Sequence, residues 1–208
     1  DLLSTGAQSF DALYFLGLIA DRRKDPDLAL RYYSRVTGGD FALQAQGRVA
    51  RIRAEQSGID AGLAHLDDFA RGQRQRGPDV VAARAGLASG LGDMNRALEI
   101  LDAGIAQYPD VFDLRMACVY AFEKAGKSDA GIRELRRLLE DRPGDPVVQN
   151  ALGYTLADRN RQLDEAEALV AAALAQMPDS AAVLDSMGWV RFRQGRPKEA
   201  LPYLERAR

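Results

Sequence analysis

The chain has 208 residues, of which 47% are hydrophobic, and a formal net charge of −2. These values provide enough apolar side chains for a core and no overall charge that would draw the chain to nucleic acid or an anionic membrane. The single cysteine, Cys118, excludes an internal disulfide framework, and the single histidine, His65, excludes a multi-histidine metal site. No apolar run approaches the roughly 18–20 residues that a membrane span requires.

Helical segments separated by turns that contain glycine or proline follow one another along the whole chain. They group into pairs, and we call the two members of each pair the first helix and the second helix. The second pair departs from the others, because its turn at Ser57–Gly58 is one residue shorter and Gly62 replaces the usual alanine. We expect a tail of a preceding repeat at residues 1–9 and then units at residues 10–39, 40–77 (degenerate), 78–111, 112–145, 146–180 and 181–208 (truncated).

Two glycines, Gly86 and Gly90, lie inside the first helix of the third unit. Each costs about 1 kcal/mol relative to alanine, so we expect this helix to be the least stable one. Three interpretations stay open. The glycines admit a close partner backbone, they form a flexible joint, or they are a tolerated weakness that the neighbouring helices stabilise.

The last two units repeat each other most clearly. Gly153 recurs as Gly188, 35 positions later, and Ala166 recurs as Ala200, 34 positions later. Small residues at these positions let the two helices of a unit approach closely. A period of about 34 residues with one helix pair in each period is typical of tetratricopeptide repeats. The sequence therefore predicts an all-α tetratricopeptide repeat solenoid, in which about six antiparallel helix pairs form a right-handed superhelix and the first helices line its concave side.

The sequence offers little for catalysis, and we expect neither enzymatic activity nor a cofactor. We expect His65 to form a surface hydrogen bond with Asp68, three positions later on the same helix, and Cys118 to be a small core residue. The basic stretch Arg71–Arg76 is interpreted as a solvated helix end, with a phosphate or nucleic-acid patch as the alternative. No aromatic residue interleaves with those arginines, which disfavours nucleic acid as a partner.

Binding is expected on the first helices, at positions spaced by three and four residues and turned away from the second helices. In the first three units this stripe consists of Asp11, Tyr14, Leu18, Asp21, Gln44, Gly47, Arg51, Glu55, Asp79, Ala82, Gly86 and Ser89. In the last three units it consists of Asp113, Met116, Tyr120, Glu123, Asn150, Tyr154, Asp158, Asp185, Trp189 and Phe192.

Aromatic residues occupy the same slot of this stripe in three successive units, at Tyr120, Tyr154 and Trp189. Aromatic side chains are frequent anchors of protein interfaces, and Asn150 and Asp185, one turn earlier, can bond a peptide backbone. The alternative is that the aromatic rings only pack between neighbouring first helices. The candidate residues for binding a peptide or protein segment are Tyr14, Leu18, Met116, Tyr120, Asn150, Tyr154, Asp185, Trp189 and Phe192.

This stripe differs from the carboxylate clamp of chaperone-binding repeat domains, which relies on lysine and asparagine in the first helices. Tyr14 and Leu18 stand where a basic residue and an amide would be needed. Recognition of a free acidic C-terminus is therefore disfavoured.

Three segments, Asn150–Arg159, Leu163–Ala166 and Leu184–Val190, resemble the C-terminal repeats of a proteobacterial tetratricopeptide repeat family. Its best-known type is an outer-membrane lipoprotein adaptor in the periplasm. That adaptor partners a carboxyl-terminal processing protease and brings it substrates such as cell-wall hydrolases. The resemblance implies the same partners and location for this chain, with the membrane anchor upstream of Asp1. The alternative is a structural or assembly scaffold in envelope or pilus biogenesis that acts through its ends and convex surface.

Overall fold

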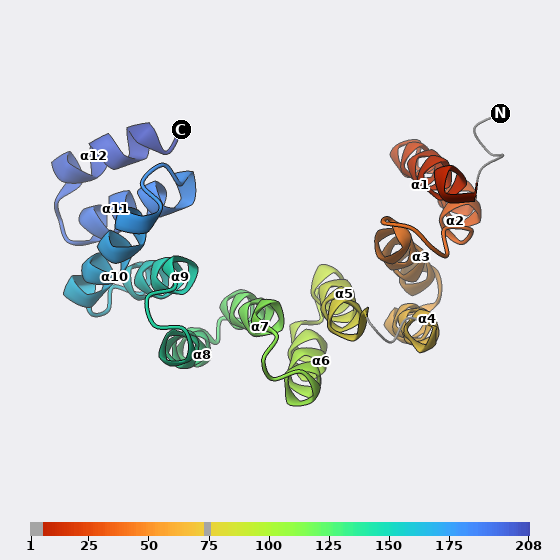
Figure 1. The fold of residues 1–208 in the computed structure, drawn as a ribbon, viewed down its shortest axis with the longest axis horizontal. Helices are drawn as coiled ribbons and strands as arrows, with labels where there is room; N and C mark the ends of the chain where they lie inside the picture. Colours follow the sequence, from red (N-terminus) through yellow and green to blue (C-terminus); the bar gives the residue numbers. More distant parts are fainter. Residues whose placement is uncertain (1–5, 73–75) are drawn as a thin grey trace. The chain divides into compact units, whose positions relative to one another are not determined.

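The structure is a computed structural model, and it describes residues 6–72 and 76–208. Every regular element in these residues is an α-helix, and twelve helices follow one another along the chain (Figure 1). They form two compact units, Asp1–Ala121 and Phe122–Arg208, which we describe separately. The predicted all-α class is confirmed. The predicted superhelix concerns both units together and stays a prediction.

One pair of helices lies at each predicted range from residue 10 onward, although the first helix of the chain begins at Gly6 and the fifth at Gly77, just outside their ranges. The first unit contains α1 (Gly6–Arg22), α2 (Pro26–Tyr33), α3 (Ala42–Ser57), α4 (Ile59–Arg71), α5 (Gly77–Gly90), α6 (Met94–Gln107) and most of α7 (Phe112–Lys124). The second unit contains α8 (Ser128–Asp141), α9 (Pro146–Asp158), α10 (Leu163–Gln176), α11 (Ala181–Arg193) and α12 (Pro197–Arg206).

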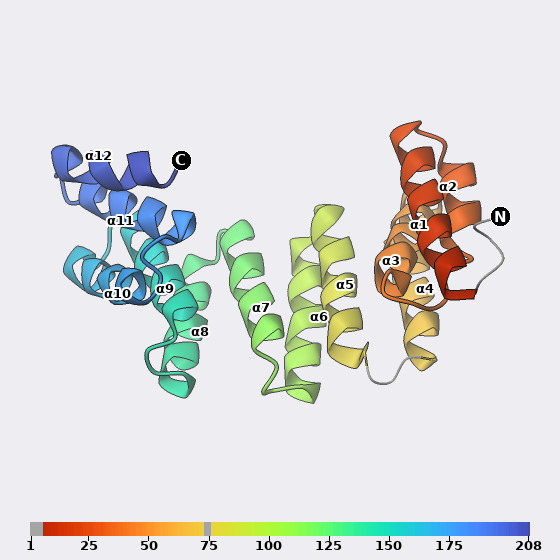
Figure 2. The same cartoon turned by 45° about the horizontal axis from the view of Figure 1, so that its top comes forward.

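The first helices of neighbouring pairs contact one another within each unit. In the first unit α1 contacts α3, and α3 contacts α5, while in the second unit α9 contacts α11. The second helices α2, α4, α6, α10 and α12 each pack against the first helix of their own pair, as Figure 2 shows for the adjacent α5 and α6. The helices α1, α3 and α5 therefore form one layer in the first unit, and α9 and α11 lie side by side in the second.

Local signals in the sequence set the ends of several helices. Gly195 adopts a φ of +76°, in the left-handed region that glycine enters without strain, and α12 begins at Pro197. The single residue Gly58, with a φ of +92°, joins α3 to α4, which explains the short turn of this pair. Aspartate side chains accept a hydrogen bond from a backbone N–H in the first turn of α2, α6 and α9, at Asp25, Asp93 and Asp145.

The two repeated glycines allow close approach of paired helices, as predicted. A Cβ atom at Gly153 would lie 2.6 Å from Cγ2 of Val170, and one at Gly188 would lie 2.5 Å from Cδ2 of Leu204. Both distances are too short for an unstrained contact, so a larger residue would push α9 from α10 and α11 from α12.

The core of the first two pairs surrounds Tyr33, whose side chain is fully buried. A Cβ atom at Gly17 would overlap the ring of Tyr33, which places the small residue directly beneath the aromatic one. The phenol donates a hydrogen bond to the carboxylate of Asp21 at 2.8 Å. Burial and this carboxylate raise the pKa of Tyr33 far above its usual value, so the hydroxyl remains a donor.

Two expectations about the ends and the surface of the first unit are wrong. Helix α1 begins at Gly6, so residues 6–9 are its first turn rather than the tail of a preceding repeat, while residues 1–5 lie outside the described residues. His65 bonds Gln46 of α3 instead of Asp68, because the short α3–α4 turn directs the imidazole toward α3. Asp68 pairs with Arg71 at 3.0 Å.

The basic stretch is described only in part, because residues 73–75 lie outside the described residues. Arg71 is the last residue of α4 and is exposed, which agrees with the interpretation of this stretch as a solvated helix end. Within the described residues, no helix is long and apolar enough to cross a bilayer.

Candidate protein-binding surface

Large apolar side chains that remain exposed lie almost entirely on the first helices. Within residues 10–72 and 76–208, the exception on a second helix is Leu201 of α12. The others lie on α1, α7, α9 and α11 or at the C-terminal end of α5: Phe15, Ile19, Leu91, Tyr120, Val147, Tyr154 and Phe192. Exposed apolar side chains concentrated on one set of helices are typical of an interaction surface.

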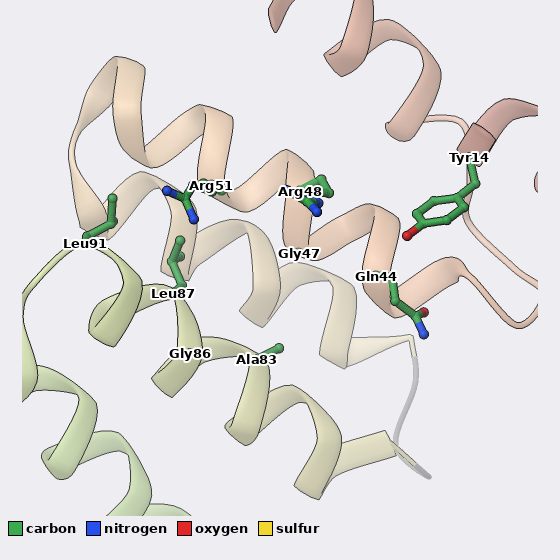
Figure 3. A pocket seen from close by; sticks show the side chains of 9 residues that line it. All are labelled: Tyr14, Gln44, Gly47, Arg48, Arg51, Ala83, Gly86, Leu87 and Leu91. Carbon is green, nitrogen blue, oxygen red and sulfur yellow. The ribbon is translucent and has the colours of Figure 1, made fainter. Parts of the chain in front are cut away.

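The first unit has a cavity of about 410 Å³ that its first helices line (Figure 3). It lies between α3 and α5, and α1 closes one end of it with the ring of Tyr14. We call it the α3–α5 pocket. Its lining residues are Tyr14, Gln44, Gly47, Arg48, Arg51, Ala83, Gly86, Leu87 and Leu91.

Five of the nine lining residues belong to the predicted stripe. They are Tyr14, Gln44, Gly47, Arg51 and Gly86. The predicted stripe omits the other four, although helical spacing contained the signal for Arg48 and for Ala83, which follows Asp79 by four positions. Arg48 follows Gln44 by four positions, just as Gly47 follows it by three, so both share its side of α3.

The pocket is electropositive. Arg48 and Arg51 both extend from α3, and none of the lining residues carries a carboxylate. Arg51 pairs with Glu55 on its own helix, with Nε 2.9 Å from Oε1 and both side chains about half exposed. Within the described residues Arg48 makes no ion pair, so its charge faces the pocket uncompensated.

The second unit carries an aromatic and polar strip on α9 and α11. The rings of Trp189 and Phe192 stack with centroids 5.6 Å apart, and the guanidinium of Arg193 lies 5.5 Å from the indole centroid. We call this surface the α9–α11 strip, and its predicted members are Asn150, Tyr154, Asp185, Trp189 and Phe192.

Two polar atoms of this strip are buried without a hydrogen-bond partner. They are Nε1 of Trp189, which is a donor, and Oδ1 of Asn150, which is an acceptor. Both atoms are shielded from solvent, so they lie beneath the surface of the strip rather than on it.

Carboxylates surround Tyr154, whose side chain is 41% exposed. Burial of the phenol, together with the negative charges of Asp158, Asp185 and Glu123, raises the pKa of Tyr154. The hydroxyl therefore stays protonated and available as a donor. Arg159 compensates part of this charge through an ion pair of 3.2 Å with Glu123.

The structure corrects one of the predicted residues, and the place of Leu18 on the binding stripe stays a prediction. Met116 is buried and cannot contact a partner, whereas Tyr120, one turn later on α7, is the most exposed of the large apolar residues. Spacing places both side chains on one stripe, but packing covers the stripe only at Met116. Leu18 is half-buried against the core of the first two pairs and lies outside the α3–α5 pocket.

Tyr14 has a packing role in addition to its place in the pocket. Its ring stacks on Phe41 with centroids 4.6 Å apart, so it is partly a packing residue even though it lines the pocket. Tyr120 belongs to the first unit, while Tyr154 and Trp189 belong to the second. Their alignment in a single ladder therefore stays a prediction.

Comparison with known proteins agrees with this architecture. Models of the tetratricopeptide repeat match residues 88–153 and 150–208, which together make up more than half of the chain. The chain belongs to the tetratricopeptide repeat family. It is 32% identical over 198 residues to the TPR repeat-containing protein PA4667 of Pseudomonas aeruginosa. That match covers 95% of this chain and 34% of the relative, so the chain spans about a third of the relative's length.

Solved structures show the same fold at low sequence identity. MamA from Desulfovibrio magneticus RS-1 superposes with a TM-score of 0.58 at 18% identity, over 81% of this chain and 94% of that one. A tetratricopeptide repeat protein from Parabacteroides merdae gives a TM-score of 0.60 at 14% identity, over 95% of this chain and 78% of that one. The predicted tetratricopeptide repeat fold is confirmed.

Proposed function

We propose that this chain is a non-catalytic scaffold that binds a segment of a protein partner on the first helices of its repeats. The observation that carries the proposal is the gathering of exposed apolar side chains on those helices. Proteins built from such repeats use the surface formed by successive units as an extended binding site.

The α9–α11 strip supplies the contacts that such a segment needs. Trp189 and Phe192 offer aromatic area, and aromatic anchors contribute much of the affinity at protein interfaces. The exposed carboxylate of Asp185 can accept a hydrogen bond from a backbone N–H of the segment, and the hydroxyl of Tyr154 can donate one to a backbone carbonyl. Binding would therefore combine hydrogen bonds to the segment with the covering of apolar surface.

We also propose that the partner is a carboxyl-terminal processing protease together with its cell-wall hydrolase substrates. The support is the resemblance of Asn150–Arg159 and Leu184–Val190 to the periplasmic lipoprotein adaptors. In this proposal the chain belongs to a protein tethered to the outer membrane and brings substrates to the protease.

The experiment compares partner binding by the wild type, Trp189→Ala and Tyr154→Ala. A partner is captured from a periplasmic lysate, purified, and its dissociation constant measured with each variant. Loss of a central anchor typically costs about 2 kcal/mol or more, which is about thirtyfold in affinity. Circular dichroism and thermal melting establish that the variants fold.

The matched control is Leu201→Ala, because Leu201 is exposed and apolar but lies on a second helix of the same unit. We expect this variant to bind like the wild type. Folded Trp189→Ala and Tyr154→Ala proteins that also bind like the wild type would refute the proposal. Loss of binding in Leu201→Ala alone would favour an assembly scaffold that acts through its second helices.

A further inference from the structure

Two groups of glycines occur in the helices, and only one of them is explained by packing. A Cβ atom at Gly62 or Gly104 would overlap a neighbouring helix, so these positions require glycine. A Cβ atom at Gly47 or Gly86 would meet nothing within 4 Å. Alanine would fit both of these positions and favour the helix, so internal packing gives no reason for glycine there.

Gly47 and Gly86 lie on opposite walls of the α3–α5 pocket (Figure 3). Without side chains, they leave the backbones of α3 and α5 open to the cavity. A ligand chain in the pocket can therefore approach the backbones of both helices more closely than it could if any residue other than glycine stood at these two positions.

The rest of the lining defines the chemistry of such a chain. Arg48 and Arg51 present two guanidinium groups, and a guanidinium binds a carboxylate through two parallel hydrogen bonds. The ion pair between Arg51 and Glu55 is exposed at the surface and therefore weak, so a ligand can compete for Arg51. Leu87 and Leu91 add apolar surface to the end of the pocket at which Arg51 lies.

We propose that the α3–α5 pocket binds an extended protein segment whose backbone lies against Gly47 and Gly86 and whose acidic side chain pairs with Arg48 and Arg51. This inference rests on the proposed scaffold function and names the chemistry of the partner in the first unit. The stretch from Gln44 to Arg51 is about 10 Å long, at 1.5 Å per helical residue. Three or four extended residues span this length, so a short internal segment is sufficient.

The test selects binders without assuming a sequence. A phage library of random peptides of about eight residues, displayed without a free C-terminus, is selected on the full chain. The enriched peptides are then synthesised with amidated C-termini and titrated by fluorescence anisotropy. We expect enrichment of aspartate or glutamate, and at least about tenfold weaker binding when the acid is replaced by its amide.

Protein variants locate the site. We expect Gly86→Leu and Arg48→Gln each to weaken binding of the acidic peptides by at least about tenfold. Ala82→Leu is the matched control for the first, because Ala82 is exposed on α5 one turn earlier and does not line the pocket. Arg31→Gln, at an exposed arginine of α2, is the control for the second.

Three results would overturn this inference. The first is a selection that yields no binder, or binders without an excess of acidic residues. The second is acidic peptides that bind Gly86→Leu as tightly as the wild type, and the third is an equal loss of peptide affinity in Gly86→Leu and Ala82→Leu. Peptides whose binding is lost in Trp189→Ala but retained in Gly86→Leu would leave the proposed scaffold function in place and refute only the α3–α5 pocket.

Discussion

His65 and Gln46 form a hydrogen bond of 2.7 Å between Nε2 of the imidazole and Oε1 of the amide. The amide nitrogen of Gln46 donates to the carbonyl oxygen of Val36 at 2.8 Å and to that of Tyr33 at 3.3 Å. Because the amide nitrogen faces these two carbonyl groups, its oxygen faces the imidazole, and Nε2 of His65 must be the donor. Three consecutive helices, α2, α3 and α4, are joined through this buried glutamine.

We expect acid to destabilise the protein through His65. Burial and the positive charge of Arg53 lower the pKa of His65 below its usual 6.5, and Asp68 opposes this only in part. The unfolded chain therefore takes up a proton more readily than the folded chain. The stabilisation from neutral His65 is complete above pH 6.5 and is lost as the pH falls through the lower folded-state pKa.

The measurement is the free energy of unfolding in denaturant at about pH 7.5 and about pH 5, on either side of the usual histidine pKa. His65→Gln keeps an N–H donor for Gln46 but cannot titrate, so it should lose less stability on acidification than the wild type. His65→Ala should cost about 1–3 kcal/mol at neutral pH, because the buried oxygen of Gln46 loses its donor. Equal acid losses in the wild type and His65→Gln would contradict this role.

Gly62→Ala and Gly86→Ala should change stability in opposite directions. A Cβ atom at Gly62 would overlap the carbonyl oxygen of Ala50 and lie 2.9 Å from Cβ of Ala54. The overlap is costly because the backbone of α3 cannot move aside as a flexible side chain could. We expect Gly62→Ala to destabilise the fold by about 1–3 kcal/mol. Gly86→Ala should stabilise it by about 0.5–1 kcal/mol, because the added methyl group meets no atom and favours the helix. Denaturant midpoints measure both changes, and shifts of the same sign would disprove the packing argument.

Glu167 should be the most important carboxylate of the last two pairs. Its Oε1 lies 2.6 Å from Nη2 of Arg191, and its Oε2 accepts a hydrogen bond of 2.7 Å from Gln194. The side chain of Arg191 is only 16% exposed, so removal of the carboxylate leaves a mostly buried charge with weaker compensation. We expect Glu167→Ala to cost about 2 kcal/mol.

The control is Glu55→Ala, which removes the exposed pair with Arg51. An exposed ion pair within a helix contributes about 0.3–0.5 kcal/mol, so this variant should be close to the wild type in stability. Similar losses in Glu167→Ala and Glu55→Ala would show that burial does not strengthen the Glu167 pair.

The helix pairs and their repeat could be predicted from the sequence because the signals are local. A left-handed turn at Gly195 followed by Pro197 stops one helix and starts the next, whatever surrounds them. The recurrence of Gly153 as Gly188 marks a close helix crossing, and a larger residue there would clash with Val170 or Leu204. Turn chemistry and periodicity therefore determined the number, the order and the pairing of the helices.

Only the tertiary structure decided which residues of the predicted stripe are open to a partner. Helical spacing sets the direction of a side chain around its own helix, but the packing of neighbouring elements decides whether that side chain is covered. Met116 is buried and Tyr120 exposed for this reason, although four positions separate them on α7. The α3–α5 pocket also combines Tyr14 of α1 with Arg48 of α3, and His65 bonds a glutamine 19 positions away. Contacts between such distant positions depend on how three helices pack together, which no local pattern contains.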